Sequence, residues 1–481
     1  MPKIIGIILI LFYNFISCII IIPFQTFNPL LVKNVKLLEL IKNASDNDII
    51  ITISKNLIYT NLEIGERKQI ITIFIEMGSN ELYFKDLAIH TGLPPLNNIN
   101  NNNCAYINNY LFNIIKLNYY NSSLSKSYKY IYSCPEYLED YFYDRDVFGK
   151  EIIYLKEKNK TINKEEYKLI EFYINFKEYE KYDNRPGIIG FNIKNSKFIK
   201  RLKELSIIKN NNWNIKYNNF YEEKGEIIIG DLPHIYDEKN YNKDNLRYAN
   251  LYNKSNYEYS LNFDDIYITL NNQNFYLEKN EIASFYIEEF FIFGTSEYFE
   301  LIEDLFFRKY INEQICHKKV HKYKNIMYYF ICYINDNKVR EIFFNNFPSL
   351  TFYQKQMNYN FTLDAKDLFT IIPDNNRILF NIGFINNSKK WIFGKPFFKK
   401  YQFIFNSKSK KIIYYANSSL NVKEIKSNEI SRKLYFIIFF VFISGFLFGK
   451  IICFKYNRKI RANELEDNYS YLSNNTNNIN N

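Results

Sequence analysis

The sequence predicts a mainly β protein divided into two lobes. Its 481 residues, 47% of them hydrophobic, can bury a core large enough for two lobes. Residues 58–84 predict a short strand, a turn at Gly65 and a second strand. In the second strand, the alternating positions of Ile71, Ile73 and Ile75 are typical of a strand with one buried face. We expect the rest of the chain to be organised around this hairpin.

The second strand ends in the loop Glu76-Met77-Gly78-Ser79, which is the first candidate functional site. Gly78 can adopt backbone conformations that are closed to other residues, so it predicts a tight turn directly after the strand. A rigid strand that ends in a carboxylate is a place where an enzyme mounts an acid or a base. Glu76 is therefore the first candidate catalytic residue.

The charge distribution and the few histidines argue against some classes of function. The formal net charge of +11 is spread along the chain rather than gathered in a Lys/Arg block with interleaved aromatic residues, so it does not predict nucleic-acid binding. His317 and His321 lie beside Cys316, but two histidines are too few for a zinc site if Cys316 is in a disulfide. We predict no metal and no other cofactor.

The two ends of the chain predict a secreted, membrane-anchored protein. Residues 1–23 contain Lys3 and two apolar runs, the pattern of a signal segment, although an uncleaved anchor stays an alternative. Residues 434–454 form an apolar run long enough for a transmembrane helix across a bilayer core of about 30 Å, with a basic flank at residues 455–461. We expect a single-pass type I protein of the secretory pathway or cell surface, with a disordered cytosolic tail at residues 455–481.

Four cysteines lie between these ends as a near pair in each half, Cys104 with Cys134 and Cys316 with Cys332. Such local pairs suit small disulfide-closed loops in an oxidising compartment. Glycosylation motifs agree with a lumenal or extracellular domain and begin at Asn43, Asn121, Asn159, Asn253, Asn360, Asn386 and Asn417.

The hairpin at residues 58–84 resembles the first active-site region of pepsin-like aspartic proteases. The residues that fit the family pattern are Tyr59, Ile64, Gly65, Gln69, Gly78 and Ser79. In this alignment the family's first catalytic aspartate falls on Glu76, and the threonine that follows it falls on Met77.

Further matches follow in the family's order. Tyr143 falls where the family has the tyrosine of its active-site flap, although the glycine turn of the flap is missing. Residues 187–191 and 225–230 resemble two glycine-containing segments of the first lobe, and residues 391–405 resemble the family's most specific segment. Cys316 and Cys332 match the family's second-lobe disulfide. The resemblance implies a bilobal, pepsin-like double-ψ β-barrel fold with lobes at residues 50–240 and 255–420.

The family's second active-site loop falls on residues 290–296 in this alignment. Gly294, Thr295 and Ser296 fit the loop well. The second catalytic aspartate then falls on Ile292, and the neighbouring threonine falls on Phe293.

The resemblance also implies which groups peptide cleavage would require. In this family two aspartates about 3 Å apart share one proton and together activate a water. Glu76 alone does not replace the pair, and Ile292 has neither a charge nor a lone pair. Glu288 and Glu289 precede Ile292, but at most one is expected to point inward, and it would need a shift along the strand to reach the centre.

The bracing of the two loops is also altered, because Met77 and Phe293 cannot form the hydrogen bonds of the family's threonines. We therefore expect a catalytically inactive homologue whose cleft binds an extended peptide or protein ligand by strand addition. One alternative is an active aspartic-type endopeptidase with an unusual dyad. Another is a purely structural or adhesive protein whose cleft is plugged by Phe291, Phe293 and Met77.

Overall fold

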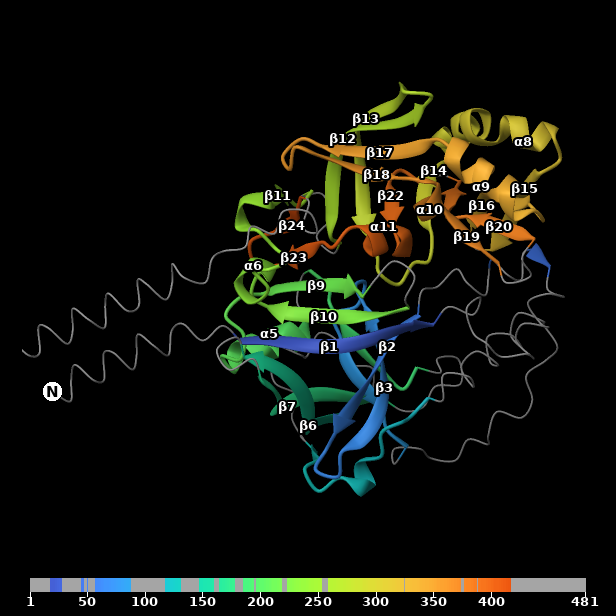
Figure 1. Cartoon of the computed structure of the whole chain (residues 1–481). Coiled ribbons are helices and arrows are strands. Elements are labelled where there is room, and N and C mark those ends of the chain that lie inside the picture. The colour runs from blue at the N-terminus through green and yellow to red at the C-terminus, as the bar shows by residue number, and fades with distance from the viewer. Residues whose placement is uncertain are drawn as a thin grey trace, which may run out of the picture. The chain divides into compact units, whose positions relative to one another are not determined.

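The computed structural model of the chain describes residues 18–27, 45–46, 50, 57–87, 117–130, 147–159, 164–177, 185–193, 196–218, 223–252, 258–323, 325–372, 376–386 and 388–416. These residues are mainly in β-strands, which form two large curled sheets, as the fold class predicts (Figure 1).

The first sheet has 13 strands within the described residues. In spatial order they are β11 (Leu246–Asn250), β24 (Lys411–Tyr415), β23 (Ile404–Asn406), β9 (Asn212–Tyr217), β10 (Lys224–Gly230), β1 (Cys18–Phe27), β2 (Leu57–Ile64), β3 (Gln69–Glu76), β8 (Gly187–Gly190), β4 (Leu82–Lys85), β7 (Lys164–Lys177), β6 (Val147–Asn159) and β5 (Lys129–Tyr130).

The second sheet has 11 strands within the described residues. Ten follow one path: β18 (Tyr359–Leu363), β17 (Ser349–Gln354), β12 (Ser260–Leu270), β13 (Gln273–Phe285), β22 (Trp391–Phe393), β14 (Ile292–Thr295), β21 (Ile382–Ile385), β16 (Asn325–Tyr333), β20 (Arg377–Phe380) and β19 (Phe369–Ile371). The eleventh, β15 (Cys316–Tyr323), pairs with β16.

Short helices connect the strands. The α-helices are α5 (Lys197–Glu204), α6 (Pro233–Tyr236), α7 (Phe299–Ile302), α8 (Arg308–Asn312), α9 (Asn337–Asn346), α10 (Ala365–Leu368) and α11 (Lys395–Lys400). The remaining turns are the 3-10 helices η3 (Ser122–Leu124), η5 (Lys243–Asn245) and η6 (Ser296–Tyr298), and the π-helical turn η7 (Glu303–Phe307).

The predicted hairpin is present as β2 and β3, which pair in antiparallel register with Tyr59 opposite Phe74. Gly65 lies in the turn with φ +74°, a conformation that favours glycine. The prediction of one buried face is wrong for β3, because Thr72 and Phe74 are buried as well as the three isoleucines. Phe74 packs in a separate cluster with Tyr83 and Ile188.

Each sheet contains the same three-strand motif. In the first sheet β3 runs parallel to β8, and β8 runs antiparallel to β4. In the second sheet β13 runs parallel to β22, and β22 runs antiparallel to β14. A glycine marks the end of the middle strand in both motifs, since Gly190 ends β8 and Gly394 directly follows β22. This repeat gives two loops that can be compared residue by residue.

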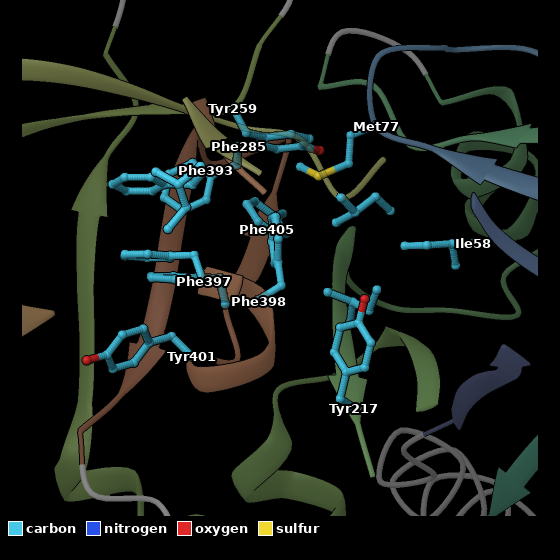
Figure 2. Close-up of a cluster of buried hydrophobic side chains, with 14 of the residues drawn as sticks. Ile58, Met77, Tyr217, Tyr259, Phe285, Phe393, Phe397, Phe398, Tyr401 and Phe405 are labelled. Carbon is cyan, nitrogen blue, oxygen red and sulfur yellow. The ribbon is translucent and has the colours of Figure 1, made fainter. Parts of the chain in front are cut away.

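One hydrophobic core extends across both sheets. Phe393 and Phe397 stack with ring centroids 3.9 Å apart, and Phe285 packs edge-on against Phe393 at 5.4 Å. Met77 and Ile58, from the first sheet, belong to the same cluster (Figure 2). Aliphatic and aromatic side chains from the two sheets therefore pack in one core.

The C-terminal strands do not follow the predicted lobe boundary. We predicted residues 255–420 as one lobe, but β23 and β24 pair with β9 and β11 in the first sheet (Figure 1). Trp213 of β9 stacks on Phe405 of β23 at 4.7 Å, and its indole N–H donates to the Tyr259 hydroxyl at 3.1 Å. Phe405 thus packs on the fully buried Trp213 from the neighbouring strand β23 of the same sheet.

The predicted signal segment overlaps a strand. Residues 18–23, which we assigned to the signal, form the first part of β1, which pairs with β10 and β6. Ile20 and Ile22 are fully buried. A run of isoleucines suits a buried strand as well as a signal segment, and the boundary at residue 23 stays a prediction. Residues 1–17 lie outside the described part.

Several other predicted features also lie outside the described residues. They are the apolar segment 434–454, the tail 455–481, the flap residue Tyr143, and Cys104 and Cys134. Among the residues that the structure describes, no helix is long and apolar enough to cross a membrane.

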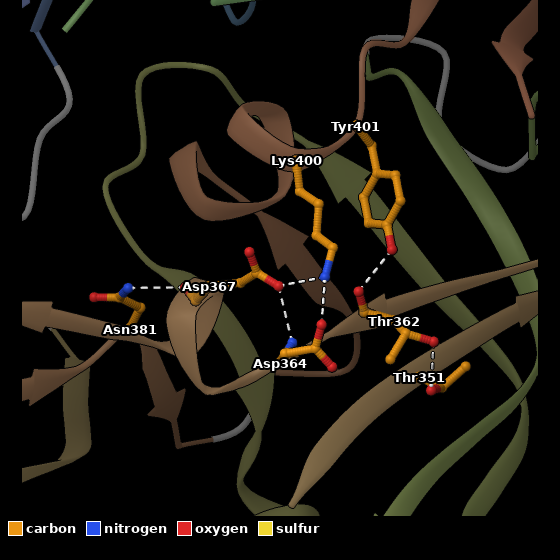
Figure 3. A network of polar contacts seen from close by, with 7 residues as sticks. All are labelled: Thr351, Thr362, Asp364, Asp367, Asn381, Lys400 and Tyr401. Carbon is orange, nitrogen blue, oxygen red and sulfur yellow. Dashed lines mark hydrogen bonds and ion pairs between the residues drawn. The ribbon is translucent and has the colours of Figure 1, made fainter. Parts of the chain in front are cut away.

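A polar network fixes α10 and α11 against the second sheet (Figure 3). The Lys400 ammonium pairs with Asp367 at 2.5 Å and with Asp364 at 3.0 Å. The Tyr401 hydroxyl donates to the carbonyl of Thr362 at 2.6 Å, and the Asn381 side chain donates to the carbonyl of Asp367 at 3.0 Å. These contacts hold the chain in place directly after Gly394.

Candidate functional site

The loop at residues 76–79, called the Glu76 loop from here on, lies at the end of β3 as predicted. The Glu76 carbonyl accepts the Phe191 amide at 2.7 Å, which ties the end of β3 to the chain after β8. The Glu76 carboxylate forms an ion pair with the Arg185 guanidinium. Both side chains are half-buried, with 25% and 30% of their surfaces exposed, so the pair is reachable from solvent.

The sheet register identifies the loop that corresponds to it. In the first motif Glu76 is the partner of Gly190. In the second motif Phe285 is the partner of Phe393, so the next residue, Tyr286, lies opposite Gly394. The Tyr286 amide donates to the Phe393 carbonyl at 3.0 Å. Residues 286–289, called the Tyr286 loop, therefore hold the position in the second sheet that the Glu76 loop holds in the first.

The strands after the two loops support this register. β4 begins at Leu82 and β14 begins at Ile292, each six residues after the residue opposite the glycine. In β4 Tyr83 pairs with Ile188, which lies two residues before Gly190. In β14 Phe293 pairs with Ile392, which lies two residues before Gly394. Ile292 is thus the counterpart of Leu82 and not of Glu76.

The sequence alignment placed the second catalytic position at Ile292, and the pairing of the strands shows that this alignment is out of register. Ile292 is fully buried inside β14, where it pairs with Ile382 in parallel and its amide donates to the Asn381 carbonyl at 2.9 Å. Gly294 and Thr295 continue the same strand, and Ser296 begins η6. The sequence Gly294-Thr295-Ser296 resembles a catalytic loop but forms the strand that follows the loop.

Two glycines allow each loop to pack against its partner strand. A Cβ on Gly190 would lie 2.3 Å from the Ser79 carbonyl oxygen, and a Cβ on Gly394 would lie 2.1 Å from that of Phe291 and 2.5 Å from that of Glu289. Ser79 and Glu289 are each the fourth residue of their loop. Gly190 and Gly394 therefore allow two backbones to approach closely.

Gly78 has a different role from the one predicted. Its φ does not lie in the left-handed region, so no special backbone conformation requires a glycine here. Instead, an added Cβ would lie 3.1 Å from a carboxylate oxygen of Glu288 and 3.7 Å from the Tyr286 ring. The small residue makes room for the Tyr286 loop.

Glu288 joins the two loops. Its carboxylate accepts the Met77 amide at Oε2, 3.2 Å away, and the Gly78 amide at Oε1, 3.1 Å away. Burial and, to a smaller extent, the Glu76 charge raise the pKa of Glu288 from 4.5 to about 7, although the hydrogen bonds from the amides lower it. We predicted that a glutamate here would need a shift to reach the centre, but Glu288 reaches the Glu76 loop without one.

Tyr286 holds the position of a second carboxylate but offers a phenol. Its hydroxyl is hydrogen-bonded to Glu258. Burial, together with the Glu258 hydrogen bond and the nearby glutamate charges, raises the pKa of Tyr286, so the phenol stays protonated at neutral pH. It can donate a hydrogen bond, but it cannot take a proton from a water.

The residue after each catalytic position is apolar, Met77 after Glu76 as predicted and Ile287 after Tyr286, whereas Phe293 lies in β14, beyond the second loop. Met77 is buried in the main core. Phe291 and Phe293 are buried in a second cluster with Phe27 and Met327, so they fill the space between the sheets beside β14. The Ser79 hydroxyl accepts the Glu81 amide at 3.1 Å within its own loop.

A second polar site, which no sequence pattern predicted, lies beside α11. A cavity of about 70 Å³ is lined by Glu223, Phe290, Asp367, Phe369, Thr370, Asn381, Lys395, Pro396 and Lys399. Glu223 pairs with Lys395 at 2.5 Å and with Lys399 at 2.8 Å. Burial lowers the pKa of Lys395 to about 8, and Glu223 opposes this effect. Because these charges are paired with one another, we assign no ligand to the cavity.

The second disulfide prediction is confirmed. Cys316 and Cys332 are bonded and lie directly opposite each other on β15 and β16, with Cα atoms 3.9 Å apart. The pairing of Cys104 with Cys134 stays a prediction. His317 packs against the Tyr333 ring, and no cluster of three metal-binding side chains occurs in the described ranges.

Comparisons with known proteins identify the fold. No protein-family model matches the chain, and no curated protein matches its sequence. Among solved structures, a basic 7S globulin from soybean is 12% identical with a TM-score of 0.52, covering 85% of this chain and 98% of the globulin. Conglutin gamma, a basic 7S globulin from lupine seeds, is 9% identical with a TM-score of 0.54, covering 83% of this chain and 95% of conglutin.

The fold is pepsin-like. Both similar structures and the two curled sheets support this statement. At such low identity the likeness shows the fold alone, so the function has to be argued from the residues of the two loops.

Proposed function

We propose that this chain is a pepsin-fold protein without peptidase activity. The observation that carries the proposal is the replacement of the second carboxylate by Tyr286 at the position opposite Gly394. The family's chemistry needs two carboxylates that share a proton around one water. Here the first position carries Glu76, whose charge is engaged by Arg185, and the second carries a protonated phenol.

The same cleft suits binding of an extended peptide or protein segment. The Glu76–Arg185 pair is half-exposed and offers one acceptor and one donor group to a ligand. The proposal places the protein in the secretory pathway or at the cell surface, anchored by residues 434–454, in keeping with the apolar run and basic flank of that segment.

The rival function is an aspartic-type endopeptidase with an unusual dyad. One observation favours it, namely that the Glu76 charge raises the pKa of Glu288, so the two carboxyl groups are near enough to interact. Against it, Glu288 accepts two amides and Glu76 pairs with Arg185, which leaves the two carboxyl groups committed to different partners.

A peptide-library cleavage assay on the purified full-length chain between pH 3 and pH 7 tests the proposal. We expect no cleavage above that of the Glu76→Gln variant and no tight binding of pepstatin, whose hydroxyl needs two carboxylates. Cleavage that disappears in both Glu76→Gln and Glu288→Gln would establish the rival. Cleavage that persists in both variants would point to a contaminating protease.

A further inference from the structure

Glu288 is the side chain that connects the two loops most directly. It lies in the Tyr286 loop of the second sheet, and its carboxylate spans two consecutive amides of the Glu76 loop. The two residues it joins, Glu288 and Met77, are 211 positions apart in the sequence. The contact therefore fixes one loop against the other at the point where Glu76 emerges.

The contact depends on the charge of Glu288. A carboxylate has two oxygens that accept hydrogen bonds, and each oxygen here has its own amide donor. A carboxylic acid keeps one good acceptor, because its second oxygen carries a hydrogen that would point toward an N–H donor. Protonation thus leaves one of the two amides without a good acceptor in a half-buried site.

We propose that Glu288 is a proton-responsive clasp, which as a carboxylate holds both the Met77 and Gly78 amides and as a carboxylic acid releases one of them. The clasp concerns the same cleft as the proposed function, but it does not depend on whether the cleft cleaves peptides. Its consequence is that the position of the Glu76 loop, and so of the Glu76–Arg185 pair, differs between neutral and acidic pH.

The groups around Glu288 set the pH at which the clasp responds. Burial and the facing Glu76 charge favour the acid, while the amides favour the carboxylate, and the balance gives a pKa of about 7. Glu76 is itself paired with Arg185, which lies just before β8, the strand that pairs with β3. The titratable and charged groups that face this region are Glu76, Arg185, Glu258, Tyr286, Glu289 and, through Glu258, Lys390.

The sequence supplies a selective probe, because the chain has only four methionines: Met1, Met77, Met327 and Met357. Labelling the full-length chain with ¹⁵N-methionine gives one amide signal from the clasp itself. A Met77→Leu variant identifies that signal by its loss. Met327 lies in β16 and Met357 in the turn between β17 and β18, and both serve as internal controls for folding.

We expect the Met77 amide shift to titrate with a midpoint near pH 7, while those of Met327 and Met357 stay constant. The titration should vanish in Glu288→Gln and persist in the matched control Glu289→Gln. In Glu76→Gln the midpoint should fall, because the facing negative charge is gone and Arg185 loses its partner.

A Met77 amide that does not titrate between pH 5 and pH 9 would overturn the proposal. So would a titration that is unchanged in Glu288→Gln, or a midpoint that stays or rises in Glu76→Gln. The unsubstituted chain already tests the central claim, so the proposal can fail even if a variant does not fold. Because the readout is an amide shift, its outcome is separate from that of the cleavage assay.

Discussion

The Glu76 loop and the Tyr286 loop follow the same backbone plan and carry different chemistry. Each loop follows a strand that runs parallel to the middle strand of its motif, and its first residue lies opposite the glycine at the end of that middle strand. The next strand begins six residues after this first residue. The first presents a carboxylate held by Arg185, whereas the second presents a phenol held by Glu258. The pairing of the strands requires this backbone path, but it does not determine which side chains, Glu76 or Tyr286, the loops carry.

The residues after the two motif glycines show a second difference. Phe191 follows Gly190 and is fully buried in the core. Lys395 follows Gly394 and is also buried, with 4% of its surface exposed, but it is an ammonium paired with Glu223. The same position in the repeat can therefore be filled by an apolar ring or by an ion pair, provided that the charge has a partner.

The largest expected effect comes from testing the register of the second loop. Ile292→Asp places an unpaired carboxyl in a fully buried strand and should destabilise the protein by about 4 kcal/mol. Tyr286→Asp alters a half-buried loop tip and should cost about 1 kcal/mol. Urea unfolding of both variants measures the difference. Equal costs would mean that the two positions are not as different as the sheet register requires.

Alanine at the motif glycines tests whether the two repeats pack alike. Gly190→Ala and Gly394→Ala each drive a Cβ into backbone carbonyl groups at 2.3 and 2.1 Å and should each cost about 3 kcal/mol. Gly78→Ala meets the end of the Glu288 side chain and touches the Tyr286 ring at ordinary contact distance, so it should cost about 1 kcal/mol. Denaturation midpoints in urea provide the comparison. If one motif glycine tolerates alanine and the other does not, the repeat is not symmetric.

Removing the partner of Lys395 tests the second difference. Glu223→Gln leaves the buried Lys395 ammonium with a weaker acceptor and should lower the free energy of unfolding by about 2 kcal/mol. This cost is lower than that of breaking a fully buried ion pair, because glutamine still accepts a hydrogen bond. Adding Lys395→Met should recover most of the loss. Thermal and urea unfolding of the single and double variants measure both values. Failure of the second substitution to restore stability would argue against burial of Lys395 as the cause.

The last expected effect is the pH dependence contributed by Glu288. Its pKa rises from 4.5 to about 7 on folding, so the folded state binds this proton more tightly than the unfolded state does. The stabilisation is fully present below pH 4.5 and is lost as the pH rises through about 7. Relative to Glu288→Gln, the unsubstituted chain should therefore lose stability across this interval. Urea unfolding at a series of pH values measures the difference, and a flat difference would contradict the raised pKa.

Local patterns were enough to predict the first loop. The alternation of Ile71, Ile73 and Ile75 and the glycine at position 65 act over a few residues, and β2 and β3 form where these signals predict them. Cys316 and Cys332 are likewise near in sequence, and their pairing follows from one hairpin. In each case the interacting residues lie within one hairpin, so their spacing carries the information.

The second loop could not be located in the same way. Gly294-Thr295-Ser296 resembles a catalytic loop more closely than Tyr286-Ile287-Glu288-Glu289 does, and the sequence has no local feature that rejects it. The spacing of six residues between Glu76 and β4 was the available signal, because the same spacing before β14 points to Tyr286.

The sequence by itself determined the β class, the first loop with Glu76 at its start, and the replacement of an aspartate there. The tertiary structure decided which residue faces that loop, through the pairing of β13 with β22 over more than 100 residues. It also decided the partners of Glu76 and Glu288, which are Arg185, 109 positions away, and the amides of Met77 and Gly78. Strand pairing between distant segments depends on the packing of the whole core, and no short stretch of sequence encodes it.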